Sequence, residues 1–271
     1  MSAVDVRGLS PEWIMVAGDW HRHRHARHAI QAIRFAHDNG VKVIVHVGDF
    51  GYRYGRDADN GFLFEKPIQL ALEKYDVTLI WIDGNHDNHA LLRSLEPLPN
   101  GFVKTGSSGR MFYAPRGLRW IWHDRVFAAL GGAFSVDHHH RKEGFDLFAE
   151  LEEVSRDDLN KLGTEHVDYL FCHDVPKRVS MKSMFNFVVP ENTRELIQEA
   201  VDTTKPLRVF SGHWHQRRDY RIPRKDGGES FGHCLNKEYC DDNVLFLDLI
   251  TNEVINPPLR WNQFRRNENH D

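Results

Sequence analysis

The chain has 271 residues, of which 41% are hydrophobic, so we expect one domain, residues 1–271, with a core at about 13–256 and a short solvated tail. Its formal net charge of −4 supplies no basic surface, which argues against a stable complex with nucleic acid or binding to an anionic membrane. Three cysteines without short spacings, no signal-peptide pattern and no run of ~20 apolar residues favour a cytoplasmic protein without a membrane span.

Apolar runs typical of buried strands alternate along the chain with segments of helical periodicity, which predicts an α/β fold. The expected strands are residues 13–18, 41–47, 77–82, 168–172, 207–211 and 244–250, and the expected helices are residues 26–38, 64–75, 155–162 and 193–201, with a further helix beginning at Asn88. Runs at 118–123 and 126–132 predict a hairpin, and therefore an antiparallel element in a mixed sheet. Residues 97–109 are expected to be a loop, and residues 216–242 to be irregular.

Polar side chains follow the expected strands at the points where the strands end. Asp19 and His21 come directly after the first strand and are two residues apart, so they share a face and can reach one ion together. The full set is Asp19, His21, Asp49, Asn85, His86, His173, His213 and His215. Because open α/β sheets bind ligands outside the carboxyl ends of their strands, we expect these side chains to meet in space.

This donor set combines oxygen and imidazole ligands without thiolate, which suits Mn, Fe, Zn, Co or Ni better than Ca or Mg. Seven of the eight side chains are enough for two ions, and Asp49, alone after the middle strand, is the natural bridge between them. Two ions about 3.5–4 Å apart can hold a hydroxide and clamp the phosphoryl oxygens of an in-line displacement. The residues therefore predict hydrolysis of a phosphoester.

The order of these motifs resembles that of a known family. The chain contains Asp19-Trp20-His21, Gly48-Asp49, Gly84-Asn85-His86-Asp87, His173 and Gly212-His213-Trp214-His215. This series is similar to the calcineurin-like metallophosphoesterases, whose motifs are D-x-H, G-D, G-N-H-D/E, H and G-H-x-H. The resemblance extends from Trp13 to about Ile250 and implies a four-layer αββα sandwich with two mixed β-sheets. A looser likeness of residues 131–137 to small microbial and phage members favours a prokaryotic or phage origin.

The resemblance also implies a role for each residue. One metal ion would be held by Asp19, His21, Asp49 and His215, and the other by Asp49, Asn85, His173 and His213. His86 would stay free of metal, contact the phosphate and protonate the leaving oxygen, a role worth about 10²–10⁴-fold. Asp87 would orient His86 and favour its imidazolium form, and it is also expected to cap the helix that follows. Mn is the expected ion, with Fe, Zn, Co or Ni as alternatives.

A charge count bears on the substrate. Two divalent ions, two carboxylates, a bridging hydroxide and a phosphodiester monoanion sum to zero, whereas a monoester dianion leaves a net negative site, which is costly when buried. We therefore expect a phosphodiesterase acting on small, nucleotide-type substrates, including cyclic nucleotides. The expected substrate contacts are Arg22, His23, Arg53 and Tyr54, and the cations that a monoester would need are Arg22, Arg24 and Arg53.

Several alternatives remain open at this point. The same centre would serve a nuclease or a phosphomonoesterase, and the same fold can act as a non-catalytic interaction module. A nuclease would be expected to carry an added nucleic-acid-binding domain or a long basic groove, and neither is visible in the sequence. Phe50, Tyr52 and Tyr54 either stack a base above the metals or pack against a strand.

Overall fold

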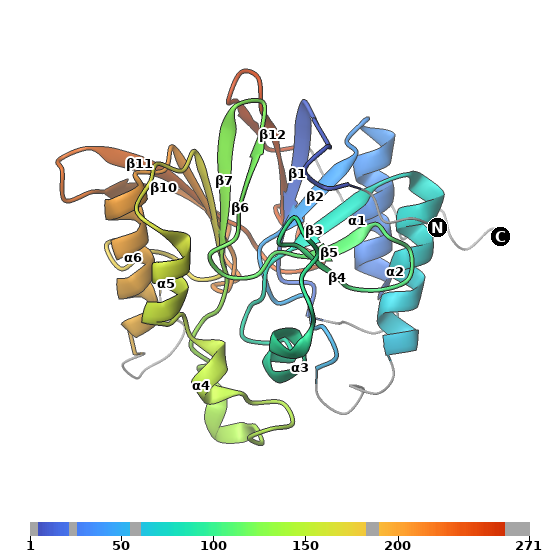
Figure 1. The fold of residues 1–271 in the computed structure, drawn as a ribbon, viewed down its shortest axis with the longest axis horizontal. Helices are drawn as coiled ribbons and strands as arrows, with labels where there is room; N and C mark the ends of the chain where they lie inside the picture. Colours follow the sequence, from blue (N-terminus) through green and yellow to red (C-terminus); the bar gives the residue numbers. More distant parts are fainter. Residues whose placement is uncertain (1–4, 22–25, 55–60, 183–189, 258–271) are drawn as a thin grey trace.

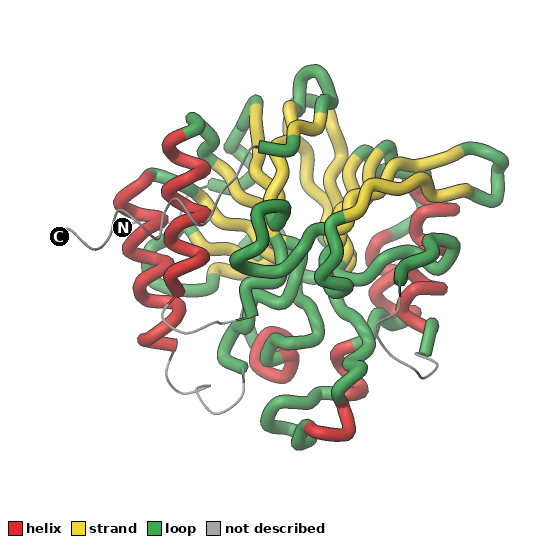
Figure 2. Tube along the Cα trace, turned by 180° about the vertical axis from the view of Figure 1, so that it is seen from behind, coloured by secondary structure: helices red, strands yellow, loops and turns green. Residues whose placement is uncertain are grey.

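The computed structural model describes residues 5–21, 26–54, 61–182 and 190–257. Two β-sheets face each other at its centre, and helices cover the outer face of each sheet (Figure 1). Helices α1 (Arg27–Asp38) and α2 (Gly61–Tyr75) pack on one sheet, and α5 (Arg156–Leu162) and α6 (Asn192–Thr204) pack on the other. Figure 2 shows from behind how the strands are enclosed between the two groups of helices. The four-layer αββα sandwich expected from the sequence is therefore confirmed.

The first sheet is mixed and has seven strands in the order β13-β12-β1-β2-β3-β5-β4. Their bounds are β1 (Trp13–Ala17), β2 (Val43–His46), β3 (Thr78–Trp81), β4 (Val103–Lys104), β5 (Met111–Tyr113), β12 (Val244–Asp248) and β13 (Val254–Ile255). Strands β1, β2, β3 and β5 run parallel, while β12 pairs antiparallel with β1. The carboxyl ends of β1, β2 and β3 therefore lie side by side.

The second sheet is also mixed and has six strands in the order β10-β11-β9-β8-β7-β6. Their bounds are β6 (Arg119–Trp122), β7 (Arg125–Leu130), β8 (Tyr169–Cys172), β9 (Arg208–Ser211), β10 (Arg218–Pro223) and β11 (Glu229–Cys234). The expected hairpin is confirmed as β6–β7, and its turn residues His123 and Asp124 both have positive φ, as a tight hairpin turn requires. Strands β7, β8 and β9 are parallel, so β8 and β9 also end together.

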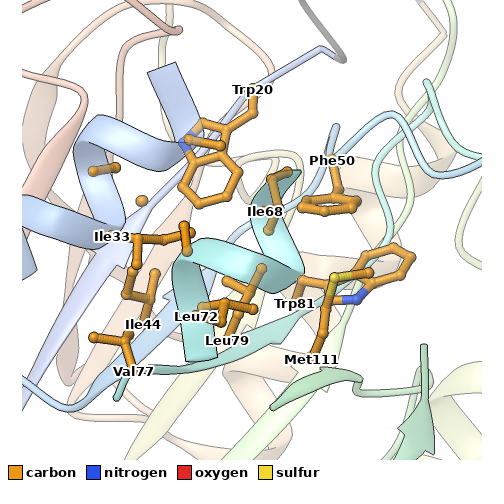
Figure 3. Packing of buried hydrophobic residues seen from close by; sticks show 14 of the residues in the cluster. Trp20, Ile33, Ile44, Phe50, Ile68, Leu72, Val77, Leu79, Trp81 and Met111 are labelled. Carbon is orange, nitrogen blue, oxygen red and sulfur yellow. The ribbon is translucent and has the colours of Figure 1, made fainter. Parts of the chain in front are cut away.

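Alternation along the strands divides the apolar residues between three clusters. On β1, Ile14 and Val16 face the space between the sheets, whereas Met15 and Ala17 face α1 and α2. Figure 3 shows part of this outer cluster, in which Trp20, just beyond β1, packs with residues of the helices and sheet. Trp20 is 1% exposed and belongs to this cluster, whereas its neighbours Asp19 and His21 are not among its members.

The remaining helices lie beyond the strand ends. Helix α3 (His89–Ser94) follows β3 after a short loop, and α4 (Ala149–Glu152) precedes α5, with a 3₁₀ turn at His138–His140 before it. Both α3 and α4 lie below the sheets in the view of Figure 1. Among the described residues, no helix is long and apolar enough to cross a membrane.

The structure corrects the expectation that residues 216–242 are irregular. Strands β10 and β11 form an antiparallel hairpin there, and β11 pairs in parallel with β9 at the edge of the second sheet. The alternation was hidden because β10 exposes most of its side chains, with only Ile222 buried. The sequence Asp226-Gly227-Gly228 at the turn is the signal that favoured a hairpin, and Gly227 has a φ of 82°. The short strands β4 and β5 were likewise not predicted.

Candidate metal centre

The strand-end residues converge from both sheets. Asp19 and His21 follow β1, Asp49 follows β2, Asn85 and His86 follow β3, His173 follows β8, and His213 and His215 follow β9. The first sheet thus supplies both carboxylates, the amide and two imidazoles, and the second sheet supplies three imidazoles. Groups of side-chain atoms drawn from this set lie within 4.8 Å of one another, which is close enough to share an ion: Asp19, His21 and His215; His21, Asp49 and His86; Asp19, Asp49 and His173.

Asp49 lies at the centre of the convergence and is 1% exposed. Its Oδ1 is 3.2 Å from Nε2 of His173, and its Oδ2 is 3.2 Å from Nε2 of His21. The two oxygens of one carboxylate therefore face imidazoles that come from opposite sheets. Oδ1 also accepts a hydrogen bond of 2.8 Å from the backbone N–H of His86, and Nε2 of His86 is 4.0 Å from Oδ2. Both oxygens of Asp49 are therefore within reach of groups from both sheets.

Asp19 lies beside His215 and His213. Its Oδ1 is 3.7 Å from Nε2 of His215 and accepts a hydrogen bond of 2.9 Å from the backbone N–H of His213. Nε2 of His215 is in turn 3.1 Å from Nε2 of His21. Across the site, the rings of His213 and His173 are 5.1 Å apart between their centres. The imidazole nitrogens thus point into a common space.

Metal ions fit these residues. Oδ2 of Asp19 and Oδ1 of Asn85 are buried and have no hydrogen-bond partner among the described residues, although buried polar atoms are normally paired. Burial raises the pKa of Asp19 to about 7, because His173 and His21 offset only part of the cost of burying its charge. Carboxylate and amide oxygens with imidazole nitrogens are also the donors that Mn, Fe and Zn accept. A divalent cation would compensate the carboxylate and pair both oxygens.

Outer contacts fix the orientation of two of the imidazoles. Nδ1 of His173 donates to the carbonyl of Val47 at 2.8 Å, which leaves Nε2 facing Asp49. Nδ1 of His21 lies 2.9 Å from the carbonyl of Asp19 and 2.9 Å from Oε2 of Glu238. Such contacts select the tautomer whose Nε2 is free to bind a metal. Glu238 was not identified from the sequence, since it lies 217 residues from His21.

The backbone at the site is held in an unusual conformation. Five of the candidate ligands have φ in the left-handed region, namely Asp19 (53°), His21 (46°), Asp49 (52°), His213 (65°) and His215 (51°). Side chains other than glycine rarely adopt this conformation, which costs on the order of 1–3 kcal/mol at each residue. Such strain persists where the surrounding structure imposes it and gathers at functional sites. The turns after β1, β2 and β9 therefore hold the ligands in place.

Two glycines permit the close approach of the strand ends. A Cβ on Gly84 would lie 2.2 Å from the backbone N and 2.2 Å from Oδ1 of Asp49, and a Cβ on Gly212 would lie 2.1 Å from Oδ2 of Asp19. No side chain fits at either distance. The glycines of the Gly84-Asn85-His86 and Gly212-His213 motifs are thus explained by the contact of the backbone with the two carboxylates.

Arg141 is a further charged residue of the site that the sequence did not identify. Its Nη2 is 2.8 Å from Nε2 of His86, and its side chain is 4% exposed. Nη1 donates to Oγ of Ser135 at 3.0 Å, and the guanidinium also pairs with Asp137. Because arginine only donates hydrogen bonds, Nε2 of His86 accepts this one and carries no proton in this arrangement. Burial, with the charge of Arg141 in addition, lowers the pKa of His86 to about 4.

Asp87 does not take the contacts expected from the sequence. Its Oδ1 accepts the backbone N–H of Tyr52 at 2.7 Å and its Oδ2 that of Gly84 at 2.9 Å, so it stabilises the turn that carries His86 and makes no hydrogen bond to the ring. Burial and the charge of Asp49 raise the pKa of Asp87 to about 7, which favours the neutral carboxyl group. A neutral Asp87 does not favour the imidazolium form of His86. The expectation that Asp87 caps α3 is wrong, because Asn88 is the capping residue.

The expected substrate contacts have different outcomes. Arg22, Arg24 and His23 lie outside the described residues. Nε of Arg53 forms an ion pair with Oε1 of Glu65 at 2.8 Å. The ring of Tyr54 lies 5.3 Å from that of His86, and its hydroxyl donates to the carbonyl of Asp146. Of the two expected contacts that lie within the described residues, Arg53 and Tyr54, it is the ring of Tyr54 that lies beside a candidate catalytic group.

Phe50 and Tyr52 are packing residues. Their rings lie 4.9 Å and 5.2 Å from the ring of Trp81, and their side chains are 0% and 6% exposed. Of the two interpretations left open for them, packing against a strand is the one that fits. Figure 3 shows Phe50 beside Trp81 in the outer cluster.

A pocket of about 240 Å³ opens beside the convergent side chains. It is lined by Asp49, Asn85, His86, His213 and His215 of the centre and by Val136, Asp137, Asp174, Trp214 and Gln216. Small-molecule sites usually combine an apolar lining with a few placed polar groups, and this pocket has both. A substrate can therefore reach the centre from this side.

Known proteins share the fold and the sequence motifs of this chain. The sequence model described as calcineurin-like phosphoesterase matches residues 13–217. Among solved structures, the protein TT1561 of Thermus thermophilus is 14% identical, with 90% of this chain and 97% of that chain covered and a TM-score of 0.52. A dimetal phosphatase from Danio rerio is also 14% identical, with 89% of this chain and 93% of that chain covered and a TM-score of 0.51. Comparison with curated protein sequences gives no match.

Proposed function

Since this chain belongs to the calcineurin-like phosphoesterase family, we propose that it is a two-metal phosphodiesterase that acts on small substrates, including cyclic nucleotides. The observation that carries the proposal is the position of Asp49, whose two oxygens each lie 3.2 Å from an imidazole of a different sheet. A carboxylate so placed can join two ions into one centre. The dimetal phosphatase from Danio rerio has the same fold.

The proposed ligand sets share this bridge. As the family resemblance implies, Asp19, His21, Asp49 and His215 would hold one ion, and Asp49, Asn85, His173 and His213 would hold the other. In support, Asp19, His21 and His215 have side-chain atoms within 4.8 Å of one another, and Oδ1 of Asn85 is buried without a hydrogen-bond partner. We expect Mn, with Fe, Zn, Co or Ni as alternatives, because imidazole and carboxylate ligands are combined. Bound there, the ions would supply Lewis-acid stabilisation of the phosphoryl oxygens and would lower the pKa of water.

His86 is the proposed general acid, and Arg141 the proposed partner of the phosphoryl group. Arg141 donates to Nε2 of His86 at 2.8 Å in the structure, so that nitrogen is within reach of any group that Arg141 binds. A phosphoryl oxygen that draws the guanidinium away would free Nε2 to take up a proton from solvent water and deliver it to the leaving oxygen. Asp87 would act as a positioning residue, because it accepts from the backbone of Gly84 in its own turn and from that of Tyr52 in the loop after β2.

The charges around the pocket favour a diester. Arg141, the proposed partner of the phosphoryl group, is already paired with Asp137, so it offsets only part of a substrate's charge. Glu238, on the opposite side of His21, adds a negative charge close to the centre. These groups would therefore compensate a phosphomonoester dianion less completely than a diester, which carries one negative charge only. The cost of uncompensated charge in a buried site supports the diester as the preferred substrate.

The test is hydrolysis of bis-p-nitrophenyl phosphate and p-nitrophenyl phosphate by chelator-treated protein to which Mn has been restored, with a panel of cyclic nucleotides beside them. We expect a higher kcat/KM for the diester. A preference for the monoester would instead make the protein a phosphomonoesterase. Cleavage of oligonucleotides with no turnover of the small diester would make it a nuclease. Two bound metals without any turnover would favour the non-catalytic module.

A further inference from the structure

We propose that Trp214 is the stacking platform for a nucleobase, so that the substrate is a nucleoside phosphodiester whose base lies beside the metal centre. This inference rests on the proposed function, since it assigns the group attached to the phosphorus. Trp214 stands between His213 and His215 in the sequence and lines the same pocket of about 240 Å³ as Asp49 and His86. A ligand whose phosphate reaches the centre therefore also reaches the indole.

The indole is held rigidly in two ways. Its Nε1–H donates to Oδ1 of Asp174 at 2.8 Å, which fixes the direction of the ring. The guanidinium of Arg194 lies 5.3 Å from the ring centre, and Arg194 is itself 8% exposed. A ring that is already immobilised loses little conformational freedom when a base stacks on it, which favours binding.

Arg194 is fixed in turn by the backbone of the segment that follows β8. It donates to the carbonyls of Val175 (3.3 Å), Pro176 (3.3 Å), Lys177 (3.3 Å) and Val179 (2.5 Å). Nη1 of Arg194 also pairs with Oε1 of Glu191 at 3.2 Å, and Glu191 does not line the pocket. The support of Trp214 is therefore built from the main chain, Glu191 and Asp174, and it does not use any of the candidate metal ligands.

The chemistry of the pocket favours a nucleobase over other aromatic groups. Val136 and Trp214 offer apolar surface, and base stacking on an aromatic side chain tolerates every base. Asp137 and Asp174 line the same pocket, so their carboxylates can accept N–H groups of a base and disfavour a second anionic group. At about 240 Å³ the pocket lies below the range of roughly 300–1,000 Å³ usual for small-molecule sites, which favours a small substrate.

The test compares two diesters with the same leaving group, thymidine 5′-(p-nitrophenyl phosphate) and methyl p-nitrophenyl phosphate. Their kcat/KM values are measured for Mn-loaded wild type, Trp214→Ala and Trp214→Phe. We expect wild type to prefer the thymidine ester, Trp214→Ala to lower this preference by about 10- to 100-fold, as the loss of one base–aromatic stack implies, and Trp214→Phe to keep most of it. Taking the ratio removes any effect on the metals or the leaving group that both substrates share.

Two results would overturn the proposal: a wild type without preference for the thymidine ester, or a Trp214→Ala variant in which both values fall equally. The failure of the proposed function is a separate result, namely no turnover of either ester by the Mn-loaded wild type. In that case calorimetric titration with thymidine 5′-phosphate and with methyl phosphate decides the matter. Tighter binding of the nucleotide that is lost in Trp214→Ala supports the platform, and equal affinities refute it.

Discussion

Replacing Arg116 by methionine tests the packing that supports the turn after β3. The side chain of Arg116 is buried, with 5% of it exposed. Its Nε and Nη2 donate to Oδ2 of Asp83 at 2.8 Å and 2.6 Å. Nη2 also donates to the carbonyl of Glu152 at 2.8 Å. Asp83 directly precedes Gly84 and Asn85, so this ion pair joins the metal-site turn to α4.

The magnitude follows from the charge that the substitution leaves behind. Removing one partner of a buried ion pair usually costs about 3–5 kcal/mol, because the other charge stays buried. The Tyr113 hydroxyl, 3.0 Å from Oδ1 of Asp83, and Nδ1 of His89, 3.5 Å from Oδ2, remain to compensate part of it. We therefore expect Arg116→Met to lower the free energy of unfolding by about 3 kcal/mol, the lower end of that range.

The assay is urea denaturation at pH 7, with Arg156→Met as a matched control. Arg156 pairs with Glu199 on the surface, where the two side chains are 58% and 43% exposed, and solvent screens such a pair so that it adds little to stability. A loss in Arg116→Met no larger than that in Arg156→Met, with unchanged m-values, would refute the reasoning.

The pH dependence of the free energy of unfolding is a second test of the same substitution. Burial raises the pKa of Asp83, but Arg116 and His89 outweigh it and hold the pKa below its usual range. A depressed pKa contributes stability that is present above the unfolded pKa of about 3.9 and is lost as the pH falls through the folded value. Without Arg116, burial raises the pKa of Asp83, and protonation then relieves the buried charge. The difference in the free energy of unfolding between wild type and Arg116→Met should therefore become smaller as the pH falls from 7 towards 4.

Three further predictions concern the centre itself. His86→Ala should lower kcat by about 10²–10⁴-fold while the metal content stays at the wild-type level, and loss of metal would make His86 a ligand. Gly84→Ala should weaken metal binding by about 10- to 100-fold in a metal titration, because its Cβ would lie 2.2 Å from Oδ1 of Asp49, whereas Gly227→Ala, with no atom within 4 Å, should not. Mn should restore the activity of chelator-treated protein and Ca should not, since Ca prefers oxygen ligands alone; equal rates would contradict the ligand chemistry.

The sequence was informative wherever a buried strand ended in a motif. The carboxyl ends of β1, β2 and β3 could be predicted to lie side by side, because short apolar runs followed by glycine are typical of central parallel strands. The approach of His173, on the second sheet, to Asp49 was predicted only from the family resemblance. Local sequence patterns do not show how two sheets pack against each other. The distance of 3.2 Å between these side chains is a property of the whole sandwich.

The sequence did not predict the strands at the edge of the second sheet or the contacts between residues far apart in the chain. The β10–β11 hairpin was missed because an edge strand with one buried side chain has no alternation to detect. Arg141 follows three histidines in a polar loop, and nothing in that stretch indicates that its guanidinium reaches His86, 55 residues away. The prediction that Asp87 caps α3 was wrong for a different reason: two neighbouring residues can cap the same helix, and only the backbone geometry selects Asn88.

The most direct test of the two-metal centre is to measure metal content and phosphodiester turnover together in Asp49→Ala and in the more conservative Asp49→Asn. Wild type loaded with Mn should hold two ions per chain and hydrolyse bis-p-nitrophenyl phosphate. Because Asp49 faces imidazoles of both sheets, both variants should lose turnover together with at least one ion, while near-ultraviolet circular dichroism stays native. Two ions retained in both folded variants would contradict the assignment of Asp49 as the bridge.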